Sequence, residues 1–207
     1  MKPPLEFTLA GDGATDRCLR TVLEWVLGQI PSLRHRGFVV QVAEPGTNLQ
    51  ERLEKAVHDY PCDLLFVHRD AEKDTREKRW EEIRRAASGA GIPSFVPVVP
   101  VRMTEAWLLI DEEAIRRAAG NPNGEVPLLL PKLAKLETMA DPKKVLRECL
   151  IRASEKTGRR LQQFERDLAE RAQRVAELIT DFSPLRQLSA FRCVENDARE
   201  ETKKLLA

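Results

Sequence analysis

The sequence predicts an α/β fold: a mostly parallel sheet of four strands, or slightly more, flanked by helices. Short apolar runs alternate with amphipathic helical patterns between Leu5 and Val101. This order is typical of right-handed crossovers within one parallel sheet. Only helical patterns follow further along the chain. We therefore place a soft boundary near residue 120, with residues 1–120 as an α/β domain and residues 121–207 as a helical appendage packed on it.

The composition is that of a globular protein. Of the 207 residues, 42% are hydrophobic and 32% are charged, which excludes a disordered chain. The formal net charge is +1, so binding to nucleic acid would need a local basic patch. No apolar run approaches the roughly 18 residues of a membrane span, and we expect no membrane association.

The ends and cysteines of the chain indicate a cytoplasmic protein. The opening Met-Lys-Pro-Pro-Leu-Glu lacks the apolar core of a signal peptide. The cysteines lie far apart and fit no CxxC metal or redox pattern: Cys18, Cys62, Cys149 and Cys193. We expect each to fill core space as a free thiol in a reducing compartment.

The first predicted strand covers residues 5–10 and ends in the glycine turn Gly11–Asp16. A helix then begins, with Thr15 as its expected N-cap. Its apolar residues recur at helical spacing: Leu19, Val22, Leu23, Val26, Leu27 and Ile30. The turn lacks the GK[ST] ending of a phosphate loop. Asp16 also stands where the GxGxxG dinucleotide fingerprint has its third glycine.

Two further strands and their helices follow. Residues 38–43 form the predicted second strand, and the apolar spacing of residues 49–60 predicts a helix that ends before Pro61. Residues 62–68 form the third strand, an apolar run typical of a buried strand in a parallel sheet. The charged residues 75–87 predict a surface helix.

The fourth strand is expected within residues 94–101, where Pro97 and Pro100 interrupt the apolar run. Because proline cannot donate to a strand ladder, this strand should be short or lie at an edge of the sheet. Thr104 is expected to cap a short helix after this strand, and Asp111 the next helix.

The helical part begins after the loop at residues 120–131. Asp141 precedes Pro142, an arrangement typical of an N-cap followed by proline at the first helical position. Apolar residues between 161 and 179 predict another helix, and Ser183 opens a last helical segment.

Acidic side chains follow three of the predicted strands. The run Leu64–Val67 ends in His-Arg-Asp-Ala-Glu, so Asp70 and Glu72 lie two residues apart, on the same side of an extended backbone. The remaining acids lie after the first and fourth strands: Asp12, Asp16 and Glu105. Because ligands bind beyond the carboxyl ends of the strands in such sheets, we expect these acids to converge.

We predict that these acids ligate a divalent cation, Mg²⁺ or Mn²⁺: Asp12, Asp16, Asp70, Glu72 and Glu105. Such cations take hard oxygen ligands and relieve the repulsion between carboxylates. A bound cation also polarises a phosphoryl oxygen and lowers the pKa of a bound water. Basic residues beside the acids are predicted to bind phosphate: Arg69, Lys73 and Arg102.

Each of these residues also has a purely structural interpretation. Asp12 suits a turn between two glycines. Asp16 and Glu105 suit the first turn of a helix, where the helix dipole favours negative charge. The acids after the third strand are also typical of a polar loop that caps the next helix. The basic residues beside them could simply balance charge.

Two motifs carry a resemblance to a known family. The segment Gly11–Asp16 is similar to E-G-x-T-[ED], and Asp70–Glu72 is similar to D-x-D. Both patterns occur in the TOPRIM domain of primases, topoisomerases and OLD-type nucleases, which the chain thus resembles. The segment Thr104–Leu109 also resembles the E-x-W-L-L stretch of an uncharacterised TOPRIM-like group often associated with phage-defence genes. Ser183–Phe191 is similar to the tail of that group.

The resemblance implies magnesium-dependent phosphodiester chemistry on nucleic acid, with Asp12, Asp70 and Glu72 as catalytic acids. Asp12 takes the place of the family's glutamate and is one methylene shorter. Asp16 takes the place of the second acid of the first loop. Asp70 and Glu72 replace the aspartate pair, and Glu72 is one methylene longer than its counterpart.

The leading hypothesis is therefore a metal-dependent nuclease or related phosphoryl-transfer enzyme, with a role in phage defence. The alternative is a non-catalytic regulatory or partner-binding module that keeps the TOPRIM-like shape. The altered acid lengths and the balanced charge favour this alternative. A nucleotide-binding domain of Rossmann type is a third hypothesis, which the missing third glycine disfavours.

Overall fold

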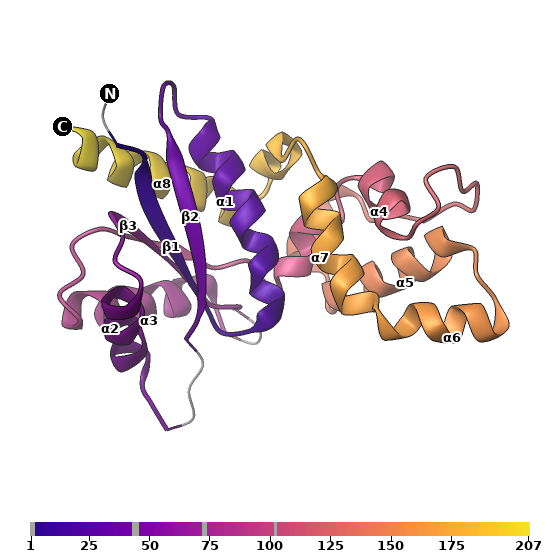
Figure 1. Cartoon of the computed structure of the whole chain (residues 1–207), viewed down its shortest axis with the longest axis horizontal. Helices are drawn as coiled ribbons and strands as arrows, with labels where there is room; N and C mark the ends of the chain where they lie inside the picture. Colours follow the sequence, from indigo (N-terminus) through magenta and orange to yellow (C-terminus); the bar gives the residue numbers. More distant parts are fainter. Residues whose placement is uncertain (1–2, 43–45, 72–73, 102) are drawn as a thin grey trace. The chain divides into compact units, whose positions relative to one another are not determined.

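A computed structural model describes residues 3–42, 46–71, 74–101 and 103–207, apart from the side chains of residues 14 and 15. Contacts divide the chain into two compact units (Figure 1). One comprises Met1–Val101 and Ser189–Ala207, and the other Arg102–Leu188. The predicted domain boundary near residue 120 stays a prediction, because contacts alone do not show which segments fold independently.

The first unit is built on a four-stranded parallel sheet with the order β2-β1-β3-β4. The strands are β1 Leu5–Gly11, β2 His35–Gln41, β3 Leu64–His68 and β4 Phe95–Val98. This confirms the predicted α/β class and its parallel sheet. β4 lies at an edge and contains Pro97, as the proline pattern predicted.

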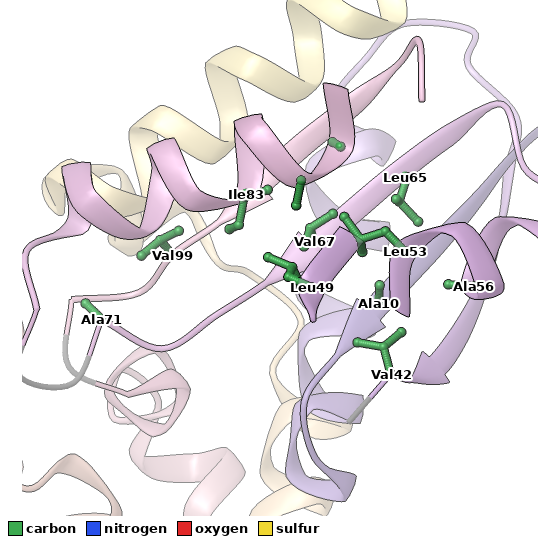
Figure 2. Close-up of a cluster of buried hydrophobic side chains, with 12 residues drawn as sticks. Ala10, Val42, Leu49, Leu53, Ala56, Leu65, Val67, Ala71, Ile83 and Val99 are labelled. Carbon is green, nitrogen blue, oxygen red and sulfur yellow. The ribbon is translucent and has the colours of Figure 1, made fainter. Parts of the chain in front are cut away.

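Helices cover both faces of this sheet. Because the strand order runs in both directions from β1, crossovers of one hand place helices on opposite faces. They are α1 Cys18–Gly28, α2 Leu49–Asp59, α3 Arg76–Gly89 and α8 Ser189–Leu206. Helices α2 and α3 pack on one face, where Leu53 and Ile83 meet Val67 of β3 (Figure 2). Strand side chains alternate between faces, so Phe7 and Phe66 point to the opposite face. Both faces are therefore buried along β1 and β3.

Helices α1 and α8 contact each other, and the ring centroids of Trp25 and Phe191 lie 6.2 Å apart. Helix α8 also contacts β4. The last helix of the chain thus belongs to the same compact unit as the sheet, although 87 residues of the other unit precede it in sequence from Arg102 to Leu188.

The second unit is helical in the residues that the structure describes. Its elements are η2 Thr104–Leu108, α4 Glu112–Ala118, η3 Leu133–Thr138, α5 Pro142–Ser154, α6 Gly158–Arg166, α7 Leu168–Leu178 and η4 Ser183–Gln187, where η denotes a 3₁₀ helix. Asp111 and Asp141 cap α4 and α5 by accepting from backbone N–H groups, as predicted. Trp107 is 1% exposed and belongs to the core of this unit.

Some boundaries differ from the predicted ones. The helix expected to begin after Thr15 starts as a 3₁₀ turn, η1 Ala14–Arg17, and α1 begins only at Cys18 with Arg17 as its N-cap. The single helix expected between residues 161 and 179 is two helices, because the chain turns at Asp167 between α6 and α7. Among the residues described, no helix is long and apolar enough to cross a membrane.

Candidate functional site

A small polar hollow lies at the carboxyl ends of β1 and β3. Its volume is about 250 Å³. It is lined by Asp12, Gly13, Asp16, His68, Arg69, Asp70 and Arg79. The hollow thus joins the turn after β1, the residues that follow β3, and the helix α3. This is the edge of an open α/β sheet where ligands bind.

A larger hollow of about 620 Å³ lies at the opposite ends of these strands. Its lining is mostly apolar: Pro3, Pro4, Leu5, Pro31, Ser32, Leu33, Arg34, Asp63, Leu205 and Leu206. It contains a single acid and a single base, so it offers few groups for acid–base or metal chemistry. The smaller hollow is therefore the better candidate for a reaction site, despite its size.

Asp12 lies at the end of β1 and forms an ion pair with the residue that follows β3. Arg69 Nε donates to Asp12 Oδ2 at 2.9 Å. The second oxygen, Asp12 Oδ1, lies 3.9 Å from Arg52 Nη1. This Oδ1 is shielded from solvent and accepts no hydrogen bond from the described residues. Asp12 therefore has one oxygen in a strong contact and one oxygen in only a weak contact.

Asp16 is held inside the turn after β1. Its Oδ2 accepts a hydrogen bond from the backbone N–H of Gly13 at 2.9 Å, and the residue is 6% exposed. A Cβ at Gly11 would lie 2.8 Å from both Cβ and Oδ2 of Asp16. Glycine at position 11 is thus what lets the buried carboxylate come this close to the end of the strand.

His68 lies between two of the acids at the end of β3. Its Nδ1 lies 3.0 Å from the carbonyl oxygen of Val98. A carbonyl only accepts hydrogen bonds, so Nδ1 carries the hydrogen. The other ring nitrogen, Nε2, lies 3.6 Å from Asp16 Oδ1 and 3.5 Å from Asp70 Oδ1. The two carboxylates are therefore gathered around one buried imidazole, whose side chain is 2% exposed.

The basic side of the hollow is a network of ion pairs between α3 and the residues that precede it. Glu82 bridges two arginines: Oε1 accepts from Arg69 Nη1 at 3.0 Å and Oε2 from Arg79 Nη1 at 2.8 Å. Arg79 Nη2 also lies 3.0 Å from Asp74 Oδ2. Lys78 donates to Asp74, and this hydrogen bond lowers the pKa of the Asp74 carboxyl. Asp74 and Glu82 thus hold Arg79 from two sides.

The structure brings together four of the predicted site residues, Asp12, Asp16, Arg69 and Asp70, in this hollow. Glu72, Lys73 and Arg102 lie outside the described residues. The remaining one, Glu105, lies on η2 in the other compact unit, where its Oε1 is 3.9 Å from Lys143 Nζ. The roles assigned to all eight residues stay predictions.

His68, Arg79 and Glu82 are not among the predicted site residues. The position of His68 at the end of a strand indicates either a side chain that orients a metal ligand or, more commonly, a packed and hydrogen-bonded histidine. Arg79 and Glu82 are three residues apart on the helix after β3, a spacing that places them on one face. Their sequence context, however, is an ordinary charged helix, which offers no sign that one face lines a hollow.

The donors of the hollow fit a hard cation in type, because carboxylate oxygens are the ligands that Mg²⁺ prefers. Asp12 Oδ1 is shielded from solvent and accepts no hydrogen bond from the described residues. It is therefore the carboxylate oxygen best placed to bind a cation. However, no group of three or more His, Cys, Asp or Glu among the described residues is arranged to hold a metal ion. A cation bound at Asp12 would therefore need further ligands from outside the described residues.

Comparison with models of protein families, with curated proteins and with solved structures found no match. The likeness to TOPRIM domains therefore rests on the short motifs of the sequence.

Proposed function

We propose that this protein is a divalent-cation-dependent phosphoryl-transfer enzyme that acts on nucleic acid, most simply a nuclease. One observation carries the proposal: Asp12, Asp16 and Asp70, from two different strand ends, line the same hollow as two arginines. Acids that hold a cation and guanidinium groups that bind phosphate are the two components that this chemistry needs. A cytoplasmic role in phage defence is part of the same proposal.

In this proposal Asp12 and Asp70 would bind Mg²⁺ or Mn²⁺, and Glu72 and Glu105 stay predicted metal ligands. The cation, when bound, polarises the phosphoryl group and lowers the pKa of a coordinated water. Asp16 keeps its place through Gly13 and keeps His68 close to Asp70. Its contribution is therefore to hold the site in shape as much as to bind the cation.

The basic residues bind the substrate in this proposal. Arg69 and Arg79 line the hollow and both contact Glu82, and their guanidinium groups carry the positive charge that favours a phosphate there. Lys73 and Arg102, which lie outside the described residues, stay predicted phosphate-binding residues. A local basic rim of this kind would provide the attraction to nucleic acid that the net charge of +1 does not.

The test is cleavage of plasmid, single-stranded DNA and RNA in Mg²⁺ or Mn²⁺. We expect Asp70→Asn and Asp12→Asn to lower the cleavage rate more than about 100-fold, because each removes a charged ligand. Glu77→Gln is the matched control: it removes an acid of the same compact unit whose side chain is 78% exposed. This control should cleave as the wild type does.

The proposal fails if the wild type cleaves none of these substrates under either cation, or if both Asp variants cleave at the rate of the control. Circular dichroism of each variant separates loss of activity from loss of fold.

A non-catalytic partner-binding module is the second candidate. The specific observation in its favour is that Asp12 is already paired with Arg69 and lies near Arg52, so its charge is balanced without a cation. This candidate predicts no heat of Mn²⁺ binding in calorimetry. Mn²⁺ binding that is lost in Asp12→Asn would exclude it.

A further inference from the structure

We propose that β2 is a dimerisation strand, whose open edge pairs antiparallel with β2 of a second copy of this chain in a register centred on Phe38. The two four-stranded sheets would then join into one continuous sheet. The inference concerns the edge of the sheet rather than the acidic hollow, and it does not depend on the proposed function.

The first observation is a row of outward backbone groups on β2. The strand lies at the end of the sheet and pairs with β1, and α1 and α2 lie on opposite sides of it (Figure 1). Leu5 N–H donates to the carbonyl of Arg34 at 2.8 Å, and Val42 N–H donates to that of Gly11 at 2.9 Å. Because alternate residues of a parallel strand face each neighbour, the even-numbered residues of β2 bond to β1. The odd-numbered residues point their N–H and C=O groups away from the sheet: His35, Gly37, Val39 and Gln41.

The opposite edge of the sheet is blocked, whereas the β2 edge is not. Leu65 N–H donates to the carbonyl of Ser94 at 3.1 Å, so the even-numbered residues of β4 face β3 and Pro97 faces outward. Proline has no N–H to offer, and β4 has only four residues. β2 has seven residues, His-Arg-Gly-Phe-Val-Val-Gln, with neither proline nor lysine. An edge strand of this kind is a template for a further strand.

The outward groups of β2 are complementary to those of a second β2 that runs antiparallel, because each such residue offers one N–H and one C=O. The strand runs from His35 to Gln41, so a two-fold axis at its central residue, Phe38, pairs the outward residues with one another. His35 then lies opposite Gln41 of the second copy, and Gly37 opposite Val39. A register centred on any other residue leaves an outward residue without a counterpart inside the strand. This match favours a second copy as the occupant of the edge.

The side chains along the edge fit the same register. Phe38, Val39 and Val40 are only half-buried, while Gly37 is buried. At the two-fold axis the two Phe38 side chains form a cross-strand pair of the closer, non-hydrogen-bonded kind. Aromatic pairs at such positions stabilise antiparallel strands. Pairing therefore covers apolar side chains that a single copy leaves partly exposed.

The charges along the strand are also compatible with a second copy. Arg36 lies opposite Val40 of the other copy, so the two Arg36 side chains stay about 14 Å apart along the strands, four residues at about 3.4 Å each. A hollow of about 240 Å³ beside Val40 contains Asp59 together with the bases Arg52 and Lys55. Arg36 brings its own acid to this hollow, because its Nη2 contacts a Glu6 oxygen at 2.7 Å. Each copy thus presents both signs of charge to the other.

The first experiment is sedimentation equilibrium of the full chain over a range of concentrations, with Val39→Pro and Val39→Ala as a matched pair. Both variants shorten or constrain the same side chain, but only proline removes the outward N–H, and it leaves the bonds to β1 in place. We expect a wild-type dimer. Val39→Pro should raise its dissociation constant at least about tenfold, because one hydrogen bond is lost from each copy. Val39→Ala should raise it by about threefold at most.

The second experiment tests the register through the residue at the axis. Phe38→Lys and Phe38→Glu each place two like charges directly opposite each other, which destabilises a strand pair. We expect each variant alone to be monomeric. An equimolar mixture of the two should dimerise again, because lysine then faces glutamate. Circular dichroism establishes that each variant is folded, and recovery in the mixture shows that neither variant had simply lost its structure.

Amide hydrogen exchange provides a residue-by-residue readout of the same edge. In the wild-type dimer we expect slow exchange at the outward residues as well as at the inward ones. In Phe38→Lys the outward amides, those of His35, Gly37, Val39 and Gln41, should exchange fast while the amides of residues 36, 38 and 40 stay protected.

Three results would overturn the proposal. A wild type that stays monomeric at all concentrations leaves the edge to a strand of another protein or to none. A dimer that Val39→Pro weakens no more than Val39→Ala forms through another surface. A mixture of Phe38→Lys and Phe38→Glu that does not dimerise excludes the register centred on Phe38.

Discussion

Cys149 is a buried thiol on α5 whose surroundings favour its protonated form. Burial raises the pKa of this thiol from 9.0 to about 11, and the negative charge of Glu148 adds to the effect. The side chain also directs its S–H toward the carbonyl oxygen of Leu128 at 3.7 Å, a contact available only to the neutral thiol. Cys149 should therefore resist ionisation in the folded protein and ionise normally once unfolded.

This difference predicts an alkaline loss of stability. The folded thiol keeps its proton to higher pH than the unfolded thiol, so its contribution is complete below pH 9 and is lost as the pH rises toward 11. We expect the free energy of unfolding to fall by about 2 kcal/mol over this range from Cys149 alone. Urea unfolding at a series of pH values measures it.

Cys149→Ala is the control for this prediction. The variant should be less stable near neutral pH because it leaves a small cavity, but its stability should fall less steeply between pH 9 and pH 11. Equal slopes for the two proteins would show that Cys149 does not contribute to the alkaline transition.

At the same scale, the acids of the site were easier to predict than their partners. Asp12 and Asp70 follow apolar strands directly, and parallel strands bring their carboxyl ends to one edge. The contact of Arg69 with Glu82, by contrast, joins the end of a strand to a helix thirteen residues further along. Which basic side chain contacts which acidic side chain depends on side-chain geometry, and the spacing of charges in the sequence does not determine it.

At the scale of elements, the packing of β2 against β1 depends on one glycine. Gly37 is paired with Phe7 on the neighbouring strand. A Cβ at position 37 would lie 2.6 Å from Phe7 Cε1, far inside ordinary contact. Phe7 cannot easily retreat, because it is fully buried and packs edge-to-face on Phe66 with ring centroids 5.4 Å apart.

We therefore expect Gly37→Ala to destabilise the protein by about 1–3 kcal/mol, the usual cost of overpacking a core. Thermal and urea unfolding measure the change. Gly28→Ala is the matched control. A Cβ added at Gly28, the last residue of α1, would contact only His35 Cε1, at 4.0 Å. That substitution should be neutral or stabilising by up to about 1 kcal/mol. Equal effects of the two substitutions would contradict the overpacking argument.

Element type was predicted better than element boundaries. The apolar run that became β3 is continuous because both faces of this strand are buried, and this signal needs no knowledge of tertiary contacts. The break at Asp167 was missed, because the apolar residues on either side continue one helical period across it. No proline or glycine marks that turn, so local sequence offers no reason for the helix to end there.

At the scale of the whole molecule, the chain leaves the α/β unit after β4 and returns to it with its last helix. Residues 189–206 form an amphipathic helix, which the sequence shows. The sequence does not show which surface the apolar face of this helix covers. That surface is formed by side chains of α1 and β4, which lie far away in sequence. From sequence alone, the last helix therefore groups with the helical segments that precede it.

If α8 completes the core of the α/β unit, its buried face must contribute to the stability of that unit. Phe191 is fully buried and lies against the ring of Trp25 on α1. We expect Phe191→Ala to destabilise the protein by about 3–5 kcal/mol, the cost of removing a large aromatic side chain from a core. Urea unfolding followed by circular dichroism and by tryptophan fluorescence measures the change.

The matched control lies near the end of the same helix. Leu205 is 39% exposed, so Leu205→Ala removes a leucine that is only partly packed and should cost less than about 1 kcal/mol. Similar losses for the two substitutions would mean that α8 does not complete the core of the sheet unit. A large loss for Phe191→Ala alone would show that the fold holding Asp12, Asp16 and Asp70 is stabilised by the final residues of the chain.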